Sequence, residues 1–218
     1  NGHDLFKCAE CFLMFVNPLP NDSSKIYSKD YFSGASQGFG YANYNADKKP
    51  MLSAWLKYLS KIEKFLPNKG ALLDVGAATG YFVRVAKDQG WQASGVELSD
   101  YAAGQGRNAG LDIITGTLDN IDGTDKFDAI TMWDLVEHLP EPGLVLRQAG
   151  HLLKKGGVLA INTPDIGSIP ARILGRKWHL IVPPEHLHYF NVFSLALLLR
   201  KAGFKVLEHS RVGKTFTL

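Results

Sequence analysis

Apolar residues recur at two different spacings along the chain, and the change from one spacing to the other predicts its main elements. Between Met51 and Phe65 they recur every three or four positions, which predicts a helix that ends before Pro67. From residue 71 onward, short apolar runs alternate with segments of helical spacing, and this alternation predicts parallel βαβ units. The predicted strands cover 71–76, 92–98, 112–115, 127–133 and 158–162, with a sixth beginning at 205–208, and the predicted helices cover 81–89, 101–108, 143–153 and 194–201.

These elements predict the α/β fold class, with a Rossmann-like, doubly wound and mostly parallel sheet that carries helices on both faces. The length of 218 residues suits one medium domain with a small appendage, and 45% hydrophobic with 21% charged residues excludes wholesale disorder. No apolar run approaches the roughly 18 to 20 residues of a membrane span, so a membrane is not expected as a partner. A net charge of +3 without a dense cationic stripe makes a nucleic acid an unfavoured partner.

The start of the chain and its cysteines bear on the compartment. No basic segment followed by an apolar run opens the chain at Asn1, so no secretory signal is visible, and native residues upstream are expected to be missing. Cys8 and Cys11 are the only cysteines, in the spacing C-x-x-C. Two cysteines exclude a disulfide framework and favour the reducing cytoplasm as the location.

A glycine-containing turn follows the first strand of the predicted sheet and leads directly into a helix. Gly76 and Gly80 allow the backbone to turn sharply and to approach a ligand. Ala78 replaces the second glycine of the dinucleotide pattern G-x-G-x-x-G, which counts against NAD. Glu97 ends the next strand, 17 residues beyond Gly80, where an acid can accept hydrogen bonds from both ribose hydroxyls. Together these features indicate a nucleoside-containing cofactor, against the alternative of a plain turn followed by a solvated glutamate.

Four segments of the chain, in this order, resemble class I S-adenosylmethionine-dependent methyltransferases. They are D-V-G-A-A-T-G-Y-F (74–82), G-V-E-L-S (95–99), F-D-A-I-T-M-W-D-L-V-E-H-L (127–139) and L-L-K-K-G-G-V-L-A-I-N-T-P (152–164). The resemblance covers residues 40–208 and implies S-adenosylmethionine as the cofactor. It implies that Asp74 and Gly76 lie by the methionine portion and that Glu97 binds the ribose. Thr117 and Leu118 would lie at the adenine, and Met132 and Trp133 beside the methionine chain. Ala77, Gly80 and Leu98 are further cofactor-binding candidates.

Other residues are candidates for the acceptor side of the site. His138 follows the strand 127–133 and is either a general base or a residue that caps or packs in the loop. Similarity to sugar C-methyltransferases implies that His138, Glu185 and His186 surround the acceptor. In the alternative, Glu185 and His186 belong to a capping motif before the helix 194–201. Tyr44, in the aromatic segment before the first helix, is a candidate contact for the cofactor carboxylate or the acceptor, against the alternative of plain packing.

The N-terminal segment is similar to the small zinc ribbon that opens some methyltransferases of this group. That similarity implies that Cys8 and Cys11 supply two of the four ligands of a tetrahedral zinc ion, with the other two upstream. The expected domains are a partial zinc-ribbon-like hairpin over 1–20, a loop and helix over 21–66 that cover the cofactor, and the methyltransferase domain over 67–218. Either the family's final antiparallel strand lies beyond residue 218, or the short tail completes the edge of the sheet.

The sequence therefore predicts a methyltransferase that uses S-adenosylmethionine to methylate a small molecule at oxygen, carbon or nitrogen. The alternative from another class is a non-catalytic cofactor-binding or zinc-ribbon interaction protein with the same fold. A nicotinamide oxidoreductase is third, disfavoured by Ala78. A nucleic-acid methyltransferase is disfavoured because no N-P-P-Y-like tetrad follows the strand 127–133.

Overall fold

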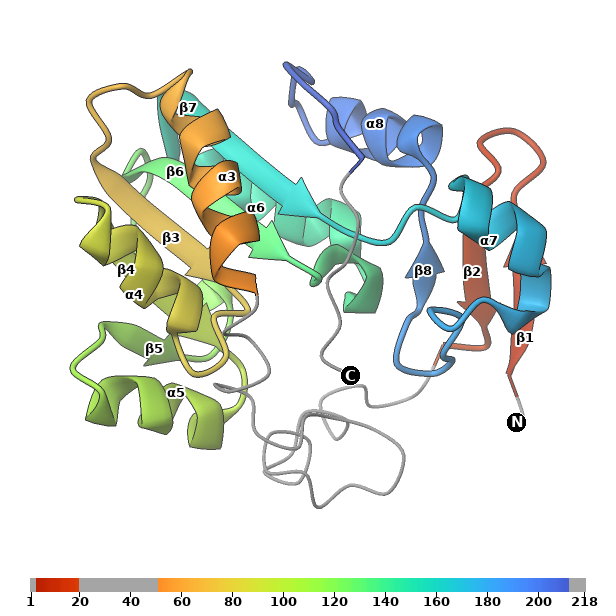
Figure 1. Ribbon diagram of the computed structural model, residues 1–218, viewed down its shortest axis with the longest axis horizontal. Coiled ribbons are helices and arrows are strands. Elements are labelled where there is room, and N and C mark those ends of the chain that lie inside the picture. The colour runs from red at the N-terminus through yellow and green to blue at the C-terminus, as the bar shows by residue number, and fades with distance from the viewer. Residues whose placement is uncertain (1–2, 20–50, 212–218) are drawn as a thin grey trace. The chain divides into compact units, whose positions relative to one another are not determined.

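The computed structural model describes residues 3–19 and 51–211, which divide between two compact units (Figure 1). One unit comprises 24–132, 151–160 and 210–218, and the other comprises 1–23, 133–150 and 161–209. Within the described ranges, no helix has both the length and the apolar character needed to cross a membrane. The boundaries expected at residues 20 and 66 stay a prediction.

A five-stranded parallel sheet dominates the first unit. Its strands, in spatial order, are β5 (Ile113–Thr115), β4 (Gln92–Glu97), β3 (Ala71–Val75), β6 (Phe127–Trp133) and β7 (Leu153–Asn162). In the register of the central strands, Val75 pairs with Val96 on one side and with Met132 on the other. The chain order therefore reverses next to β3, which is where ligands of open parallel sheets bind.

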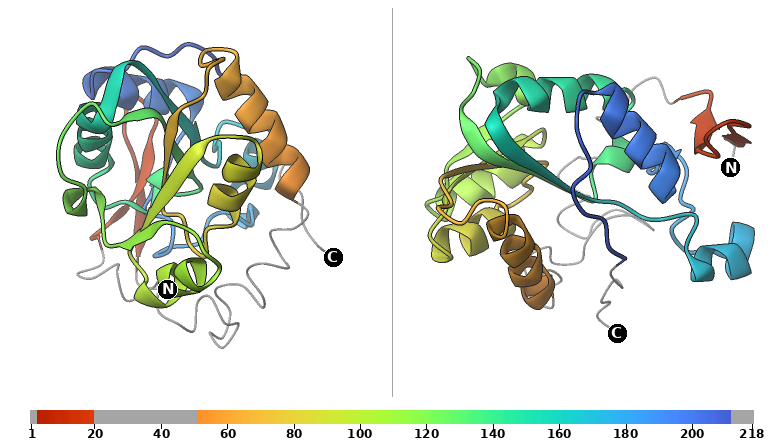
Figure 2. Two further views of the ribbon diagram at one scale, coloured as in Figure 1. Left: turned by 90° about the vertical axis from the view of Figure 1, so that its left-hand side faces the viewer. Right: turned by 90° about the horizontal axis from the view of Figure 1, so that it is seen from above.

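The helices of this unit are amphipathic and bury their apolar faces. They are α3 (Leu52–Glu63), α4 (Tyr81–Asp88) and α5 (Asp100–Asn108). Trp55 of α3 packs on Tyr81 and Phe82 of α4, with ring centroids 5.3 and 6.0 Å apart, so the two helices lie against each other (Figure 2). These elements confirm the predicted Rossmann-like sheet with helices, with ends that differ from the predicted ones by one or two residues except at β7, which begins five residues earlier.

The sixth strand predicted at 205–208 is wrong. Residues 202–211 contain neither helix nor strand, and Val206 and Leu207 are 39% and 55% exposed. The apolar residues there resemble a strand in sequence, but a strand is stable only when a neighbour accepts its backbone hydrogen bonds and covers one face. Neither condition is met in this described stretch.

The second unit contains a small antiparallel sheet of β1 (Asp4–Lys7), β2 (Met14–Asn17) and β8 (His188–Tyr189). The first two strands form the hairpin expected in the N-terminal segment, with Leu5 opposite Val16. The third strand was not predicted, because two residues are too few to produce a periodic pattern. The segment between β7 and β8 also carries α7 (Ile169–Leu174) and the 3-10 turn η5 (Gly175–Lys177).

Three further elements complete this unit. They are the 3-10 turn η4 (Val136–His138), most of α6 (Pro142–Leu152), and α8 (Val192–Lys201). Asn191 begins α8, since its side chain accepts a hydrogen bond from the Ser194 amide at 2.9 Å. The Leu187 amide donates to the Glu137 carbonyl at 2.9 Å, which joins η4 to the segment before β8.

Candidate functional site

The turn that follows β3 is held close to β4 by its backbone. The Gly76 and Ala77 amides both donate to the Val96 carbonyl, at 2.9 and 3.1 Å. Gly76, Ala78 and Gly80 all have left-handed backbone angles, with φ of 75°, 49° and 78°. These left-handed positions carry little side-chain bulk, so a ligand can approach the backbone of the turn closely.

Glu97, at the end of β4, is 6% exposed and binds two backbone amides. Its Oε2 accepts from the Ala78 amide and its Oε1 from the Ser99 amide, both at 2.8 Å. Burial raises the pKa of this carboxyl, although the amides of Ser99 and Ala78 act in the opposite direction. Because each carboxylate oxygen offers two acceptor positions, each keeps one for a hydroxyl. Two vicinal hydroxyls, as on a ribose, could donate to these two acceptor positions.

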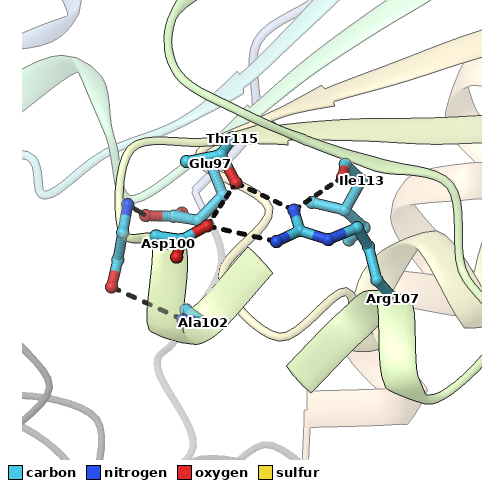
Figure 3. Close-up of polar contacts among 7 residues, drawn as sticks. Glu97, Asp100, Ala102, Arg107, Ile113 and Thr115 are labelled. Atoms are coloured by element: carbon cyan, nitrogen blue, oxygen red, sulfur yellow. Dashed lines mark hydrogen bonds and ion pairs between the residues drawn. The ribbon is translucent and has the colours of Figure 1, made fainter. Parts of the chain in front are cut away.

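The helix after Glu97 is fastened to the neighbouring strand by a charged network (Figure 3). Arg107 of α5 donates to the Thr115 hydroxyl at 2.8 Å and to the Ile113 carbonyl at 3.2 Å. Its other terminal nitrogen lies 3.1 Å from Asp100. These bonds hold α5 against β5 and so stabilise the segment in which Glu97 and Ser99 lie.

Leu98, a cofactor-binding candidate, and Thr117 and Leu118, which were expected at the adenine, differ in their surroundings. Leu98 is 47% exposed although it directly follows the buried Glu97, which provides an apolar surface for a planar base. Thr117 begins the 3-10 turn η3 (Leu118–Asn120), and Leu118 is buried. Because the Thr117 hydroxyl accepts from the Asp119 amide, this side chain already serves the turn. Contacts of Thr117 and Leu118 with adenine stay a prediction.

Asp74 has a partner that sequence reasoning missed. This carboxylate, 3% exposed, accepts a hydrogen bond of 2.7 Å from the hydroxyl of Thr131, which pairs with it across β3 and β6. A threonine within the apolar strand 127–133 is the only signal for it in the sequence. Met132 is fully buried beside this pair, whereas Trp133 ends β6. Tyr44 lies outside the described residues.

The second unit contains a cluster of Glu137, His138 and His186, called here the histidine cluster. The two imidazole rings meet edge to face, with centroids 4.7 Å apart. Nδ1 of His138 lies 2.8 Å from the Glu185 carbonyl, and Nδ1 of His186 lies 2.9 Å from the Leu180 carbonyl. Because a carbonyl only accepts, the proton of each neutral ring is on Nδ1, and each Nε2 is a base or a metal ligand.

Glu137 completes the histidine cluster and was not among the residues expected at the site. It is 1% exposed, accepts a 2.8 Å hydrogen bond from the Thr163 hydroxyl, and places Oε1 3.9 Å from Nε2 of His138. One ligand atom from each cluster member lies within 4.8 Å of the others, so the set can move a proton or hold a divalent ion. Sequence reasoning expected the Glu185 carboxylate to take part, whereas its backbone carbonyl makes the contact with His138.

Tyr189 and Phe190 lie next to the histidine cluster and are both 2% exposed. The Tyr189 ring centroid is 6.0 Å from that of His186, and burial raises the pKa of its hydroxyl to about 12. Both aromatic rings are therefore part of the packed interior of this unit. The cap of α8 is made by Asn191 and Ser194, and Glu185 and His186 take no part in it.

The tip of the N-terminal hairpin holds Cys8 and Cys11 as half-buried free thiols. The amides of Cys11 and Glu10 donate toward the Cys8 sulfur and hold the pKa of that thiol below its usual value. The Phe12 amide also donates to the Cys8 carbonyl at 3.1 Å, which closes the turn. Amides directed at a sulfur favour the thiolate, the form that binds a metal, so the pair fits two of the four ligands of zinc.

Comparisons with known proteins agree with this geometry. The sequence model of the methyltransferase domain family matches residues 44–209. A ubiquinone biosynthesis O-methyltransferase from Xylella fastidiosa is 26% identical over 179 residues, which cover 75% of this chain and 73% of the relative. One of the same name from Nitrosomonas europaea is 26% identical over 175 residues, which cover 74% and 73%.

Solved structures share the fold. A S-adenosylmethionine-dependent methyltransferase from Thermotoga maritima, described as a possible histamine N-methyltransferase, is 28% identical with a TM-score of 0.54, and the match covers 70% of this chain and 72% of that one. Another from Archaeoglobus fulgidus is 18% identical with a TM-score of 0.60, covering 72% and 69%. With the turn after β3 and the acid at the end of β4, these matches show that the chain belongs to the methyltransferase domain family and is a class I S-adenosylmethionine-dependent methyltransferase of small molecules.

Proposed function

We propose that the chain transfers the methyl group to an oxygen atom of its acceptor and that Nε2 of His138 takes the acceptor's proton. When bound, S-adenosylmethionine supplies a methyl group that its sulfonium already makes electrophilic. Nε2 of His138 would take the proton as the acceptor's O–H bond breaks, and the acceptor oxygen would gain the methyl group. The cofactor's sulfur would keep the electron pair of the broken S–CH₃ bond. The relatives described as ubiquinone biosynthesis O-methyltransferases support an oxygen acceptor.

The observation that carries this proposal is the fixed tautomer of His138. Its Nδ1 donates to the Glu185 carbonyl at 2.8 Å, so in the neutral ring the basic lone pair is on Nε2. Glu137, with Oε1 3.9 Å from that nitrogen, favours the imidazolium that forms when the proton arrives. His138 follows the last residue of β6 by five residues, so the chain keeps it within about 17 Å of the end of that strand. His186 and Glu185 line the acceptor side with it.

The cofactor roles follow from the unit that contains the sheet. We assign the ribose hydroxyls to Glu97, the adenine to Leu98, Thr117 and Leu118, and the methionine portion to Asp74 with the turn that follows it. Gly76, Ala77 and Gly80 supply the backbone of that turn, and Met132, Trp133 and Tyr44 complete the assignment. The two acceptor positions left on the Glu97 carboxylate support the ribose assignment most directly.

A methyl-transfer assay with a panel of acceptors tests the oxygen proposal. The panel contains matched phenols, anilines and carbon acids, and release of S-adenosylhomocysteine reports turnover. We expect turnover with hydroxyl acceptors and a loss of about 10²- to 10⁴-fold in His138→Gln. The same change at His151, which is exposed at the end of α6, is the control and should leave turnover intact. A preference for the aniline or carbon acceptors would exclude oxygen as the methylated atom. Full turnover of a phenol in His138→Gln would exclude His138 as the base.

Cys8 and Cys11 are assigned to a zinc ion whose two remaining ligands come from other residues. The hairpin tip between β1 and β2 and the amides directed at the Cys8 sulfur support this assignment. Zinc content, measured by mass spectrometry of the metal-loaded protein, should fall in Cys8→Ser and Cys11→Ser together, while S-adenosylmethionine binding persists. Equal zinc content in the double variant contradicts the assignment. Two free thiols also favour the cytoplasm as the compartment.

A further inference from the structure

The helix α7 exposes its large apolar side chains and buries its smallest one. Ile169 and Ile173 are 70% and 78% exposed, and Leu174 is 45% exposed, whereas Ala171 is 2% exposed. Ile169 and Ile173 are four residues apart and therefore share one face of the helix. A helix that faces only water has the opposite arrangement, with apolar residues inward. The outward face of α7 therefore calls for a partner that accepts apolar side chains.

Cations surround this apolar face. Arg172, Arg176 and Lys177 are all exposed in α7 and η5, and no acidic residue occurs anywhere from 166 to 184. Every side chain from 169 to 177 is thus either apolar or cationic, apart from one glycine. A specific protein interface also needs polar groups that pair at a density of about one hydrogen bond per 100–200 Å². The composition of this segment instead fits the interfacial layer of an anionic bilayer, where apolar side chains enter and cations meet phosphate.

The rest of the unit holds this segment in place at both ends. Before α7, the Ile166 amide donates to the Phe190 carbonyl at 2.8 Å, and Ser168 caps the helix through the Ala171 amide. After η5, Trp178 is 5% exposed and anchors the chain in the interior. The apolar face is therefore presented by an anchored element (Figure 1), which lowers the entropy that docking would cost.

We propose that α7 and η5, residues 169–177, dock the protein on the surface of anionic membranes. Ile169, Ile173 and Leu174 enter the interfacial layer, and Arg172, Arg176 and Lys177 bind lipid phosphates. No helix in the described residues can span a membrane, and surface docking does not require one. An interfacial helix lies in the plane of the membrane surface. This inference does not depend on which atom of the acceptor is methylated.

Sedimentation with lipid vesicles tests the proposal on the full chain. Vesicles of phosphatidylcholine alone are compared with vesicles that also contain phosphatidylglycerol. We expect binding to the anionic vesicles, weakened by salt and by about fivefold for each cation replaced by glutamine. Ile173→Ser should weaken it further, whereas Leu207→Ser, a matched change at another exposed apolar residue, should not. An unchanged circular dichroism spectrum and an unchanged denaturation midpoint show that each variant is folded.

Two results would overturn the proposal. One is a failure of the unaltered protein to bind anionic vesicles at low salt. The other is vesicle binding that Ile173→Ser and the glutamine variants leave unchanged, which would place the contact elsewhere. If the protein does not bind vesicles but self-associates, and Ile173→Ser abolishes that self-association, the face binds a second copy of this chain. That result would also exclude lipid as its partner.

Discussion

Two effects oppose each other at the Glu97 carboxylate, namely burial and hydrogen bonding. Its charge is destabilised by burial, and that charge is also what attracts the amides of Ala78 and Ser99 and, as proposed, the ribose hydroxyls. A glutamine in its place has one acceptor oxygen and one donor group, so it can serve only one of the two amides. The single residue therefore links the shape of the turn after β3 to the binding of the cofactor.

Replacing Glu97 by Gln should weaken the binding of S-adenosylmethionine by about 10- to 100-fold, since hydrogen bonds to a charged group are lost. Isothermal titration of the folded variant measures this change. Asp100→Asn is the matched control, because Asp100 is an exposed acid three residues further along whose bonds go to Arg107 and Thr115. If both variants bind the cofactor alike, the ribose assignment is wrong.

The raised pKa of Glu97 predicts that the stability of the folded chain depends on pH. Burial raises the pKa of Glu97 above its ordinary value of 4.5, so the folded chain holds this proton more tightly than the unfolded chain does. The linked stability is fully present below the ordinary pKa and is lost as the pH rises through the raised one. The free energy of unfolding of the unaltered protein should therefore fall relative to that of Glu97→Gln as the pH rises from about 4 toward 7. Denaturant melts at several pH values measure this difference, and a constant difference would contradict the raised pKa.

Thr131→Val tests the support of Asp74. The change preserves side-chain shape but removes the hydroxyl that donates to the buried carboxylate at 2.7 Å, so it should lower the free energy of unfolding by about 1–3 kcal/mol. Thr115→Val is the control, because the Thr115 hydroxyl accepts from Arg107 and donates to Asp100 at exposed positions, where water can replace both partners (Figure 3). A change below about 0.5 kcal/mol is expected there. Equal losses in the two variants would show that the Asp74 bond adds nothing specific.

At the scale of elements, the start of α4 depends on close packing as well as on backbone angle. Gly80 has φ of +78°, and a Cβ there would lie 2.5 Å from Leu111 Cδ1 and 2.6 Å from Ile113 Cδ1. Gly110 has the same φ but no atom within 4 Å of its would-be Cβ. The two glycines thus separate the cost of the backbone angle from the cost of the close approach.

Gly110→Ala should lower the free energy of unfolding by about 1–2 kcal/mol, because alanine is strained in the left-handed region. Gly80→Ala should cost about 1–3 kcal/mol more, since the added methyl group overpacks against β5 and the residues before it. Chemical denaturation of both variants measures the difference. Equal losses would mean that the turn after β3 can move away from Leu111 and Ile113 without cost.

At the scale of the whole molecule, the two compact units should respond differently to the cofactor. A ligand that binds only the folded state at about 100 times its Kd adds about 2.7 kcal/mol of stability. Hydrogen exchange should therefore slow in 74–80 and 97–99, where the proposed contacts lie, by up to about 100-fold. The hairpin amides of 4–17, which exchange through their own local opening, should not change. Equal slowing in the hairpin would show that both units unfold as one.

Features that depend on neighbours along the chain could be predicted from the amino-acid sequence. The five strands, the turn with Gly76 and Gly80, and the acid Glu97 at a strand end were all predicted, because periodicity and glycine placement are local properties. The same local logic failed at 205–208, where an apolar pattern lacks a partner strand. A strand is decided by its neighbour as much as by its own residues.

Contacts between residues that are distant in the chain became known from the folded structure alone. The contacts of Thr131 with Asp74, of His138 with His186, and of β8 with β2 join segments far apart in the chain, and no pattern within one segment specifies them. The outward direction of Ile173 is of the same kind, since the apolar spacing of α7 does not say which face the rest of the protein covers. Burial and hydrogen-bond partners come from packing, and packing depends on all of the elements at once.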